Sequence, residues 1–372
     1  EAAVRTAKGL QAVAARHGKD AVAVSISARM TNEEAFAMKQ LADAIGARTL
    51  CFDHRENGLK RVLGFDASPN TIDELLSTDV ILAVGFTAAK SVMRVKLMQA
   101  AKNGAKIVLI NPEGAEQELA FLHKAVYVKN DLSFLKELAR ALLDLGKTSS
   151  AEGFDAFAES LSGVTPGEQA REVAALYAGA KKAMILCQQN PLTADAAALL
   201  AEIAALSGHL NAPRDGILQL RSKNNSQGLI DLGITAGGEA MEGVKALLTF
   251  GEDPQAASVK DLEFLAVCDV HLTDTARRAD VVFPGTGFAC AEGTFTSTER
   301  RLQPVHAAID SDVPLLNWQV AGAIAQVYEV ALPYGDEADL SAALDAALPV
   351  YRNARLGEVA GGVLTCAAPV FA

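Results

Sequence analysis

The sequence predicts an α/β protein built from two doubly wound halves, each with a mainly parallel sheet. Half of its 372 residues are hydrophobic and only 5% are aromatic, a composition typical of parallel sheets covered by alanine-rich helices. Short apolar runs alternate with longer segments of helical spacing. The length also exceeds the roughly 250 residues at which a single core stops growing, so we expect two domains.

The chain begins with a helix and a strand. Residues 2–16 have helical spacing, and the apolar run 20–27 after them predicts a buried strand. Thr31 then precedes Glu34 by three residues. This spacing is a capping-box pattern, and it predicts a helix that ends at Gly46.

A second series of strand, helix and strand is clearer. Residues 77–85, 91–104 and 105–112 have these three patterns in turn, and the helix stops at a glycine. Because two parallel strands need a crossover between them, we expect the two strands to pair in parallel. A strand at 125–131 and a helix that ends at Gly146 complete the first half.

The pattern restarts after a connection at 147–170 that is rich in serine, glycine, glutamate and alanine. The elements predicted there are a strand at 181–187, a helix at 198–208, a strand and loop at 244–254, and short strands at 268–275 and 279–285. Two similar series of parallel strands indicate a duplicated architecture.

Ligands of open α/β sheets bind beyond the carboxyl ends of the strands, so the loops there are the candidate sites. Small and helix-capping residues in these loops let backbone N–H groups approach a phosphate, as at a helix N-terminus. Tight turns between strand and helix explain the same residues equally well. The four loops are 85–87, 111–114, 251–254 and 273–275.

Two segments are unusually polar for their position between apolar elements. Residues 220–233 suit a long loop that recognises a polar ligand, or a solvated connection. Residues 290–304 follow a predicted strand and carry Glu292, Glu299, Arg300 and Arg301. Either a binding loop or a salt-bridged surface loop explains them.

Several classes of protein lack support in this sequence. The formal charge of −11 disfavours nucleic acid and anionic membranes as partners. Neither GxGxxG, a P-loop, GxSxG nor a zinc-type spacing of His and Cys occurs, so we expect no catalytic or metal-ligating residue. The five cysteines include no CxxC pair, which favours reduced thiols in a cytoplasmic protein.

The ends of the sequence carry two further expectations. No apolar stretch reaches the ~20 residues that span a bilayer, so we expect no membrane insertion. The chain opens inside a helical pattern without an initiator methionine, which predicts a segment of a longer polypeptide.

In their order, these segments resemble the molybdopterin oxidoreductase family, which includes formate dehydrogenase catalytic subunits and the large iron-sulfur subunit of NADH:quinone oxidoreductase. The resemblance covers almost the whole sequence. It is carried by SARMTNEEAFAMKQLADAIG, DVILAVG with GAKIVLINP, LRSKNNSQGLIDLG, LLTFGEDP and, most specifically, ADVVFPGTGFACAEGTFTSTERRLQ.

The resemblance implies two related α/β domains, one inserted in the other, each holding a pterin guanine dinucleotide. The insert corresponds to residues 50–179, and residues 1–49 and 180–372 form the other domain. The positions that match nucleotide-binding loops are Gly85, Asn111, Pro112 and Asp131 in the insert, and Asn225, Gly228, Asp231, Gly233, Gly251, Asp253 and Pro254 in the other domain.

The sequence departs from the family pattern at the cofactor. The metal-ligating Cys or selenocysteine should precede His-Gly-Pro, but Cys51 lies too early and no His-Gly-Pro follows it. Glu113 replaces an expected arginine, which weakens anion binding by charge. Residues 86–89 lack the expected Asn, and the bulky 187–191 replaces a glycine-rich loop.

Three functions stay open at this point. The preferred one is a cofactor-free, structural domain pair from the large iron-sulfur subunit of an NADH dehydrogenase, docked to iron-sulfur and flavin modules and able to pair with itself in isolation. The second is a fragment of an active formate dehydrogenase with a molybdenum bis(molybdopterin guanine dinucleotide) centre. The third is a stand-alone nucleotide-binding interaction protein.

Overall fold

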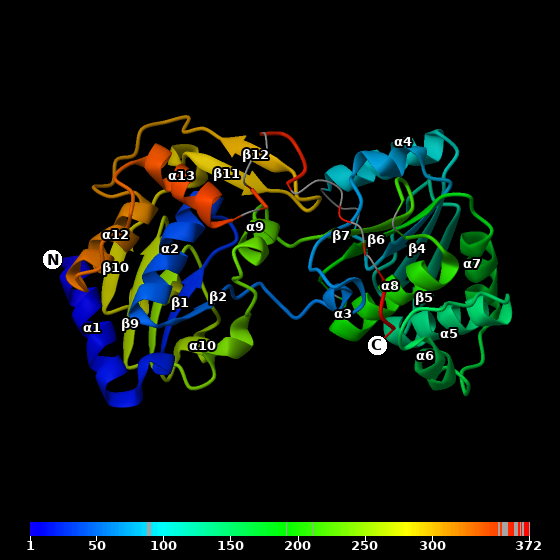
Figure 1. Ribbon diagram of the computed structural model, residues 1–372, viewed down its shortest axis with the longest axis horizontal. Helices are drawn as coiled ribbons and strands as arrows, with labels where there is room; N and C mark the ends of the chain where they lie inside the picture. The colour runs from blue at the N-terminus through cyan, green and yellow to red at the C-terminus, as the bar shows by residue number, and fades with distance from the viewer. Residues whose placement is uncertain are drawn as a thin grey trace. The chain divides into compact units, whose positions relative to one another are not determined.

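The computed structural model describes residues 1–87, 91–190, 192–210, 212–348, 350–351, 356–360, 364, 366 and 368–371. The chain divides into two units (Figure 1). Unit 1 comprises Glu1–Glu56 and Lys223–Gly361, and unit 2 comprises Asn57–Ser222 and Gly362–Ala372. The second unit therefore interrupts the first in sequence.

Unit 1 is built on a five-stranded parallel sheet with the strand order β10-β9-β8-β1-β2. From β1 the chain first adds β2 on one side, and it later adds β8, β9 and β10 on the other side. The point where the strand order reverses therefore lies between β1 and β8. The strands are β1 (Val22–Ile26), β2 (Arg48–Leu50), β8 (Ala246–Phe250), β9 (Phe264–Asp269) and β10 (Val281–Pro284).

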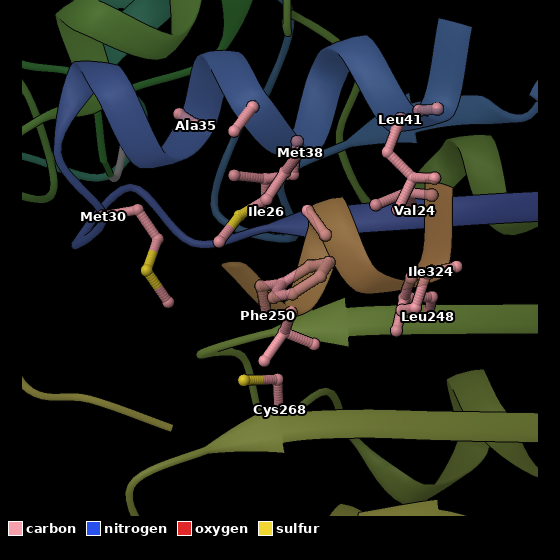
Figure 2. Packing of buried hydrophobic residues seen from close by; sticks show 14 of the residues in the cluster. Val24, Ile26, Met30, Ala35, Met38, Leu41, Leu248, Phe250, Cys268 and Ile324 are labelled. Atoms are coloured by element: carbon pink, nitrogen blue, oxygen red, sulfur yellow. The ribbon is translucent and has the colours of Figure 1, made fainter. Parts of the chain in front are cut away.

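Helices cover both faces of this sheet because its strands alternate buried apolar side chains between the two faces. Val24 and Ile26 of β1 contribute to the larger core, whereas Ala23 contributes to the smaller one. Figure 2 shows Ala35, Met38 and Leu41 of α2 over the first of these faces. That face carries α1 (Ala2–His17), α2 (Asn32–Ile45) and α12 (Asn317–Val327), with α13 (Glu337–Ala347) packed on α2; the other carries α10 (Ala256–Val259), α11 (Asp274–Arg278) and η3 (Gly238–Met241).

The capping box predicted at the start of α2 is confirmed. The Thr31 hydroxyl accepts a hydrogen bond from the Glu34 backbone N–H at 3.1 Å, and the Glu34 carboxylate accepts one from the Thr31 N–H at 2.9 Å. The helix ends at Gly46, whose φ of 72° lies in the left-handed region that glycine adopts without strain.

Unit 2 repeats the architecture with a five-stranded parallel sheet of order β5-β4-β3-β6-β7. Here the strand order reverses between β3 and β6. The strands are β3 (Val80–Val84), β4 (Lys106–Pro112), β5 (Lys124–Val128), β6 (Ala183–Gln188) and β7 (Gly216–Leu220). The predicted fold class, two doubly wound parallel sheets, is therefore confirmed.

The two faces of the second sheet are also covered. One carries α3 (Leu59–Leu63), α5 (Asp131–Asp144), α6 (Phe154–Ser160), α7 (Glu168–Ala178) and α8 (Ala194–Ser207). The other carries α4 (Val92–Lys102) and η2 (Asp73–Ser77). No helix in the described part of the chain is long and apolar enough to cross a membrane.

The boundary between the units differs from the predicted insert at 50–179. Residues 180–222, which were assigned to the other domain, contain β6 and β7 and belong to unit 2. Val80 of β3 pairs with Ala183 of β6, about a hundred residues later, and this pairing fixes the assignment. The turn-rich connection at 147–170 therefore marks no boundary.

Three local predictions are corrected. The strand expected at 268–275 ends at Asp269, and α11 begins at Asp274. The segment 220–233, expected as a long loop, contains the helix α9 (Ser226–Asp231). The segment 290–304, expected as a loop, is an antiparallel hairpin of β11 (Gly293–Thr296) and β12 (Leu302–Val305) with a buried turn. Two short 3-10 turns, η1 (Lys19–Ala21) and η4 (Phe288–Cys290), complete unit 1.

Candidate functional site

Each sheet has one point where the strand order reverses, and ligands of open α/β sheets bind in the crevice beyond the strands there. In unit 1 the crevice is bounded by the loops after β1 and β8. In unit 2 it is bounded by the loops after β3 and β6. The loops that were predicted at 85–87 and 251–254 are two of these four.

In unit 1 the side chain of Met30 occupies the space between the two loops. Gly251 has a φ of 64°, and a Cβ atom on it would lie 2.5 Å from Met30 Cε and 3.3 Å from Ser27 Cβ. Figure 2 shows Met30 in the loop between β1 and α2. The two strands are also joined there, since the Ser27 N–H donates to the Phe250 carbonyl at 3.0 Å.

Asn225, a predicted cofactor contact, faces inward and is fully buried. Its amide nitrogen donates to the Met30 carbonyl at 2.8 Å, and its side-chain oxygen accepts from the Thr296 N–H at 2.8 Å. Its own N–H donates to the Ala28 carbonyl at 3.0 Å. Asn225 therefore fixes the loop after β1 against the hairpin.

Gly228 and Asp231 also make internal contacts. A Cβ atom on Gly228 would overlap the side-chain oxygens of Asn32 and Asn225, so only glycine lets α9 pack this closely. The Asp231 carboxylate accepts hydrogen bonds from Gln227, from Arg300 at 3.3 Å and from Tyr351 at 3.2 Å. Burial raises its pKa, and Arg300 opposes the rise. Gly233, with a φ of 83°, follows the end of α9.

Asp253 and Pro254 hold the start of α11. Asp253 Oδ1 accepts from the Thr275 N–H at 3.1 Å, and hydrogen bonding by Thr275 lowers the pKa of Asp253. The Pro254 carbonyl accepts from the Thr275 hydroxyl at 3.3 Å. Thr273 caps the same helix by accepting from the Ala276 N–H at 3.1 Å. The N–H groups of Thr275 and Ala276 are thus already bonded.

Cys51 is buried against a carboxylate. Its thiol donates to Glu252 Oε1 at 3.4 Å, and the Phe52 N–H donates to the same oxygen at 3.1 Å. Burial raises the pKa of Glu252 to about 7. Burial and the neighbouring Glu252 charge raise the pKa of the Cys51 thiol well above its usual range. Both effects disfavour the thiolate, which is the form that binds metals.

In unit 2 a side chain bridges the corresponding crevice. Gln188, the last residue of β6, accepts a hydrogen bond through Oε1 from the Thr87 N–H at 2.9 Å. Phe86 is fully buried, and Gly85, with a φ of 62°, donates its N–H to the Ile110 carbonyl at 2.9 Å. Ala88, Ala89 and Pro191, which belong to the same predicted loops, lie outside the described residues.

The remaining predicted residues of unit 2 lie near the ends of β4 and β5. Asn111 is buried and donates to the Phe86 carbonyl at 2.9 Å. Pro112 pairs with Val128 at the end of β5, and the Glu113 N–H donates to the Val128 carbonyl at 2.9 Å. Asp131 is the first residue of α5, and burial raises its pKa.

The sequence analysis missed a buried polar cluster at the start of α2. The Glu33 carboxylate accepts from the Thr294 N–H at 2.7 Å and from its hydroxyl at 3.0 Å. Asn32 donates to the Thr294 and Thr296 hydroxyls, both at 3.0 Å. Burial raises the pKa of Glu33 to about 7. An acidic residue in the first turn of a helix is common, because it interacts favourably with the helix dipole. Glu33 therefore gave no sequence signal of its contact with the hairpin.

The described residues include no group of three or more His, Cys, Asp or Glu side chains that could hold a metal ion. All five cysteines are free thiols.

The family model for molybdopterin oxidoreductases matches residues 1–326. The chain belongs to the molybdopterin oxidoreductase family. It is 27% identical to an F420-dependent formate dehydrogenase alpha subunit of Methanococcus maripaludis, over 84% of this chain and 57% of that protein. It is also 27% identical to formate dehydrogenase H of Escherichia coli, over 87% of this chain and 57% of that enzyme.

Two further proteins resemble this chain. The NADPH-Fe(3+) oxidoreductase alpha subunit of Geobacter sulfurreducens is 26% identical over 82% of this chain and 44% of its own length. Acetylene hydratase from Pelobacter acetylenicus shares the fold with a TM-score of 0.69 at 13% identity, over 88% of this chain and 58% of that chain. The chain thus spans about half the length of each of these four proteins.

This chain also matches a second solved structure, and it covers nearly the whole length of that protein. A chain of the formyltransferase/hydrolase complex from Methylorubrum extorquens aligns with a TM-score of 0.59 at 16% identity, over 87% of this chain and 96% of that chain. At this identity the likeness concerns the fold alone.

Proposed function

We propose that this chain is a cofactor-free, structural pair of molybdopterin-type domains from the large iron-sulfur subunit of an NADH dehydrogenase complex. The observation that carries the proposal is the state of the two crevices. Met30 fills the space beside Gly251 in unit 1, and Gln188 binds the Thr87 N–H in unit 2. The residues present do not fit a dinucleotide at either place.

A pterin dinucleotide requires backbone N–H groups that point at its phosphates. At the unit 2 crevice the Thr87 N–H is bonded to Gln188. In unit 1, Asp253 of the loop after β8 is bonded to the Thr275 N–H at the start of α11, and Thr273 is bonded to the next N–H, that of Ala276. A ligand would have to break these bonds and displace the buried Met30 side chain. Both steps oppose binding.

Charge supports the same conclusion. Glu113 follows β4, where the family pattern has an arginine. An acid beside a phosphate repels it, whereas the arginine that it replaces would form charge-assisted hydrogen bonds.

The chain also offers no ligand for molybdenum at the family position. Cys51 is the nearest thiol, and it donates to Glu252 inside the core of unit 1.

A scaffold of this kind would dock iron-sulfur and flavin modules on the cytoplasmic side of a membrane complex. The Geobacter relative supports a nicotinamide-linked complex, because its name describes the alpha subunit of an NADPH-Fe(3+) oxidoreductase. Exposed apolar side chains, among them Phe288 and Leu272, also favour pairing of isolated copies.

The alternative function is that of a formate dehydrogenase segment with a molybdenum bis(molybdopterin guanine dinucleotide) centre. Its support is the 27% identity to two formate dehydrogenases over more than 80% of this chain. In that case the two crevices must open when the cofactor binds.

Nucleotide binding separates the two proposals. Calorimetric titration of the purified protein with GDP, with and without magnesium, should give no saturable heat if the crevices are closed. A variant with Met30→Gly and Gln188→Ala serves as a control in which both obstructions are removed. Saturable binding of GDP to the unmodified protein would contradict the scaffold proposal.

A further inference from the structure

Unit 1 has a groove of about 660 Å³ beside the start of α2. Its lining residues come from α13, from the hairpin of β11 and β12, and from Glu33 of α2. Figure 1 shows α13 near this hairpin. None of the predicted cofactor residues lines it.

The groove combines acidic walls with an apolar floor. Its carboxylates are Glu33, Glu292, Asp336, Glu337 and Asp345. Among the described lining residues the one cationic candidate is His306, which lies 2.7 Å from Glu292. Leu302, Pro304, Leu344 and Leu356 supply apolar surface between these groups. Such a surface suits a cation that carries an aliphatic stem.

A small chamber continues inward from this groove. Glu292 and Glu337 line both spaces, and the chamber reaches Glu34, Thr286 and Trp318. Its volume of about 10 Å³ is room for roughly one water-sized atom.

Two polar atoms of the chamber lack a partner among the described residues. The Thr286 hydroxyl and the Trp318 indole N–H have no hydrogen bond there, although each residue is only 8% exposed. Leaving a buried donor unsatisfied costs about 1–3 kcal/mol, so such groups usually receive a partner. The missing partner of an indole N–H is an acceptor oxygen.

We propose that this groove binds a basic, extended segment of a partner protein. Lysine or arginine side chains of the segment lie along the apolar floor and reach the carboxylates of α13 and the hairpin. A carbonyl oxygen of the segment completes the hydrogen bond of Trp318 in the chamber. A free polyamine supplies cations but no acceptor, and so leaves that N–H unpaired.

This inference rests on the proposed scaffold function for the existence of a partner, and it names the chemistry of that partner. The residues that line the groove differ from those named at the cofactor crevices. Binding at the groove and binding of GDP can therefore succeed or fail separately.

The test is fluorescence anisotropy of the whole protein with a fluorescein-labelled peptide of alternating lysine and alanine. The double variant Glu337→Gln and Asp345→Asn removes two charges that α13 contributes to the groove. It should weaken binding about tenfold at low salt, as expected for two exposed charge pairs. The matched control Asp261→Asn removes an exposed charge from the same unit and should change nothing.

Trp318→Phe tests the chamber. It keeps an aromatic ring but removes the indole N–H, so it should weaken peptide binding several-fold while leaving spermidine binding unchanged. Equal affinity of the parent, the α13 double variant and the control for the peptide would overturn the proposal. A spermidine affinity equal to the peptide affinity would also overturn it. An unaltered peptide affinity in Trp318→Phe would overturn it as well. GDP binding is measured separately, so a failure of peptide binding does not decide the scaffold proposal.

Discussion

Gln188 Oε1 accepts the Thr87 backbone N–H at 2.9 Å, and this bond joins the loops that follow β6 and β3. The two residues are separated by 101 positions in the sequence. They meet because β3 and β6 are neighbours at the point where the strand order of unit 2 reverses. In unit 1, Met30 of the loop after β1 lies beside Gly251 of the loop after β8, and so also joins the two loops where the strand order reverses. Both crevices are therefore occupied by the protein itself.

Gly251→Ala should strongly destabilise unit 1. The added Cβ would meet Met30 Cε at 2.5 Å and would sit at a φ of 64°. Overpacking costs about 1–3 kcal/mol, and the left-handed backbone about 1 kcal/mol more. Urea unfolding of the single and double variants measures the effect.

Met30→Ala provides the second arm of that cycle. If Met30 fills the crevice, Met30→Ala should relieve part of the cost of Gly251→Ala, with a coupling of about 0.5–3 kcal/mol. Strict additivity of the two substitutions would show that Met30 does not occupy the space beside Gly251.

Stability should fall as the pH rises from about 4.5 to about 7. Burial raises the pKa of Glu252 from 4.5 to about 7, so the folded protein binds more protons than the unfolded protein in this window. The free energy of unfolding then decreases with pH, and it levels off above the folded-state pKa. Glu33 contributes in the same direction, since burial raises its pKa to about 7 as well.

Glu252→Gln should flatten this dependence, because the glutamine does not ionise. The measurement is the urea midpoint of the parent and the variant between pH 5 and pH 8, with Asp261→Asn as a control for an exposed acid. An unchanged pH slope in Glu252→Gln would mean that Glu252 titrates normally in the folded protein.

Much of the fold follows from local patterns. The capping box of Thr31 and Glu34 and the stop at Gly46 define α2 from adjacent residues alone. The strands β3 and β4 are equally visible as apolar runs. The unit boundary is not, because the assignment of residues 180–222 depends on the pairing of Val80 with Ala183.

The sequence predicted which residues belong to the candidate site, but not what their side chains contact. Asn225 and Asp231 were predicted as cofactor contacts from the family resemblance, and in the structure their polar atoms bind Met30, Thr296 and Arg300. A sequence shows that a polar residue is present and does not show where its side chain points. The Gln188 bond to Thr87 depends on a tertiary contact that no local spacing reveals.

Cys290 should react first with iodoacetamide in the native protein. It is partly exposed, whereas Cys51, Cys187, Cys268 and Cys366 are buried. Burial also raises the pKa of Cys187 and Cys268 to about 12, which suppresses the reactive thiolate. Peptide mapping after brief labelling identifies the modified thiol. Rapid labelling of Cys51 under native conditions would contradict its place in the core.

Isolated copies should pair at high concentration through exposed apolar side chains. Phe288 is 77% exposed and Leu272 is 60% exposed in unit 1. Phe288→Ser should shift the mass from light scattering toward the monomer, while Asp261→Asn leaves it unchanged. A strict monomer for the unmodified protein at high concentration counts against pairing.

The central claim is that neither crevice holds a molybdopterin cofactor. The most direct measurement is molybdenum and tungsten content by elemental analysis, together with pterin fluorescence of the denatured extract, on protein purified from a host that makes the cofactor. Formate dehydrogenase H prepared in parallel shows that the host loads the family. The account predicts metal and pterin near zero in this protein, and near-stoichiometric amounts of both would contradict it.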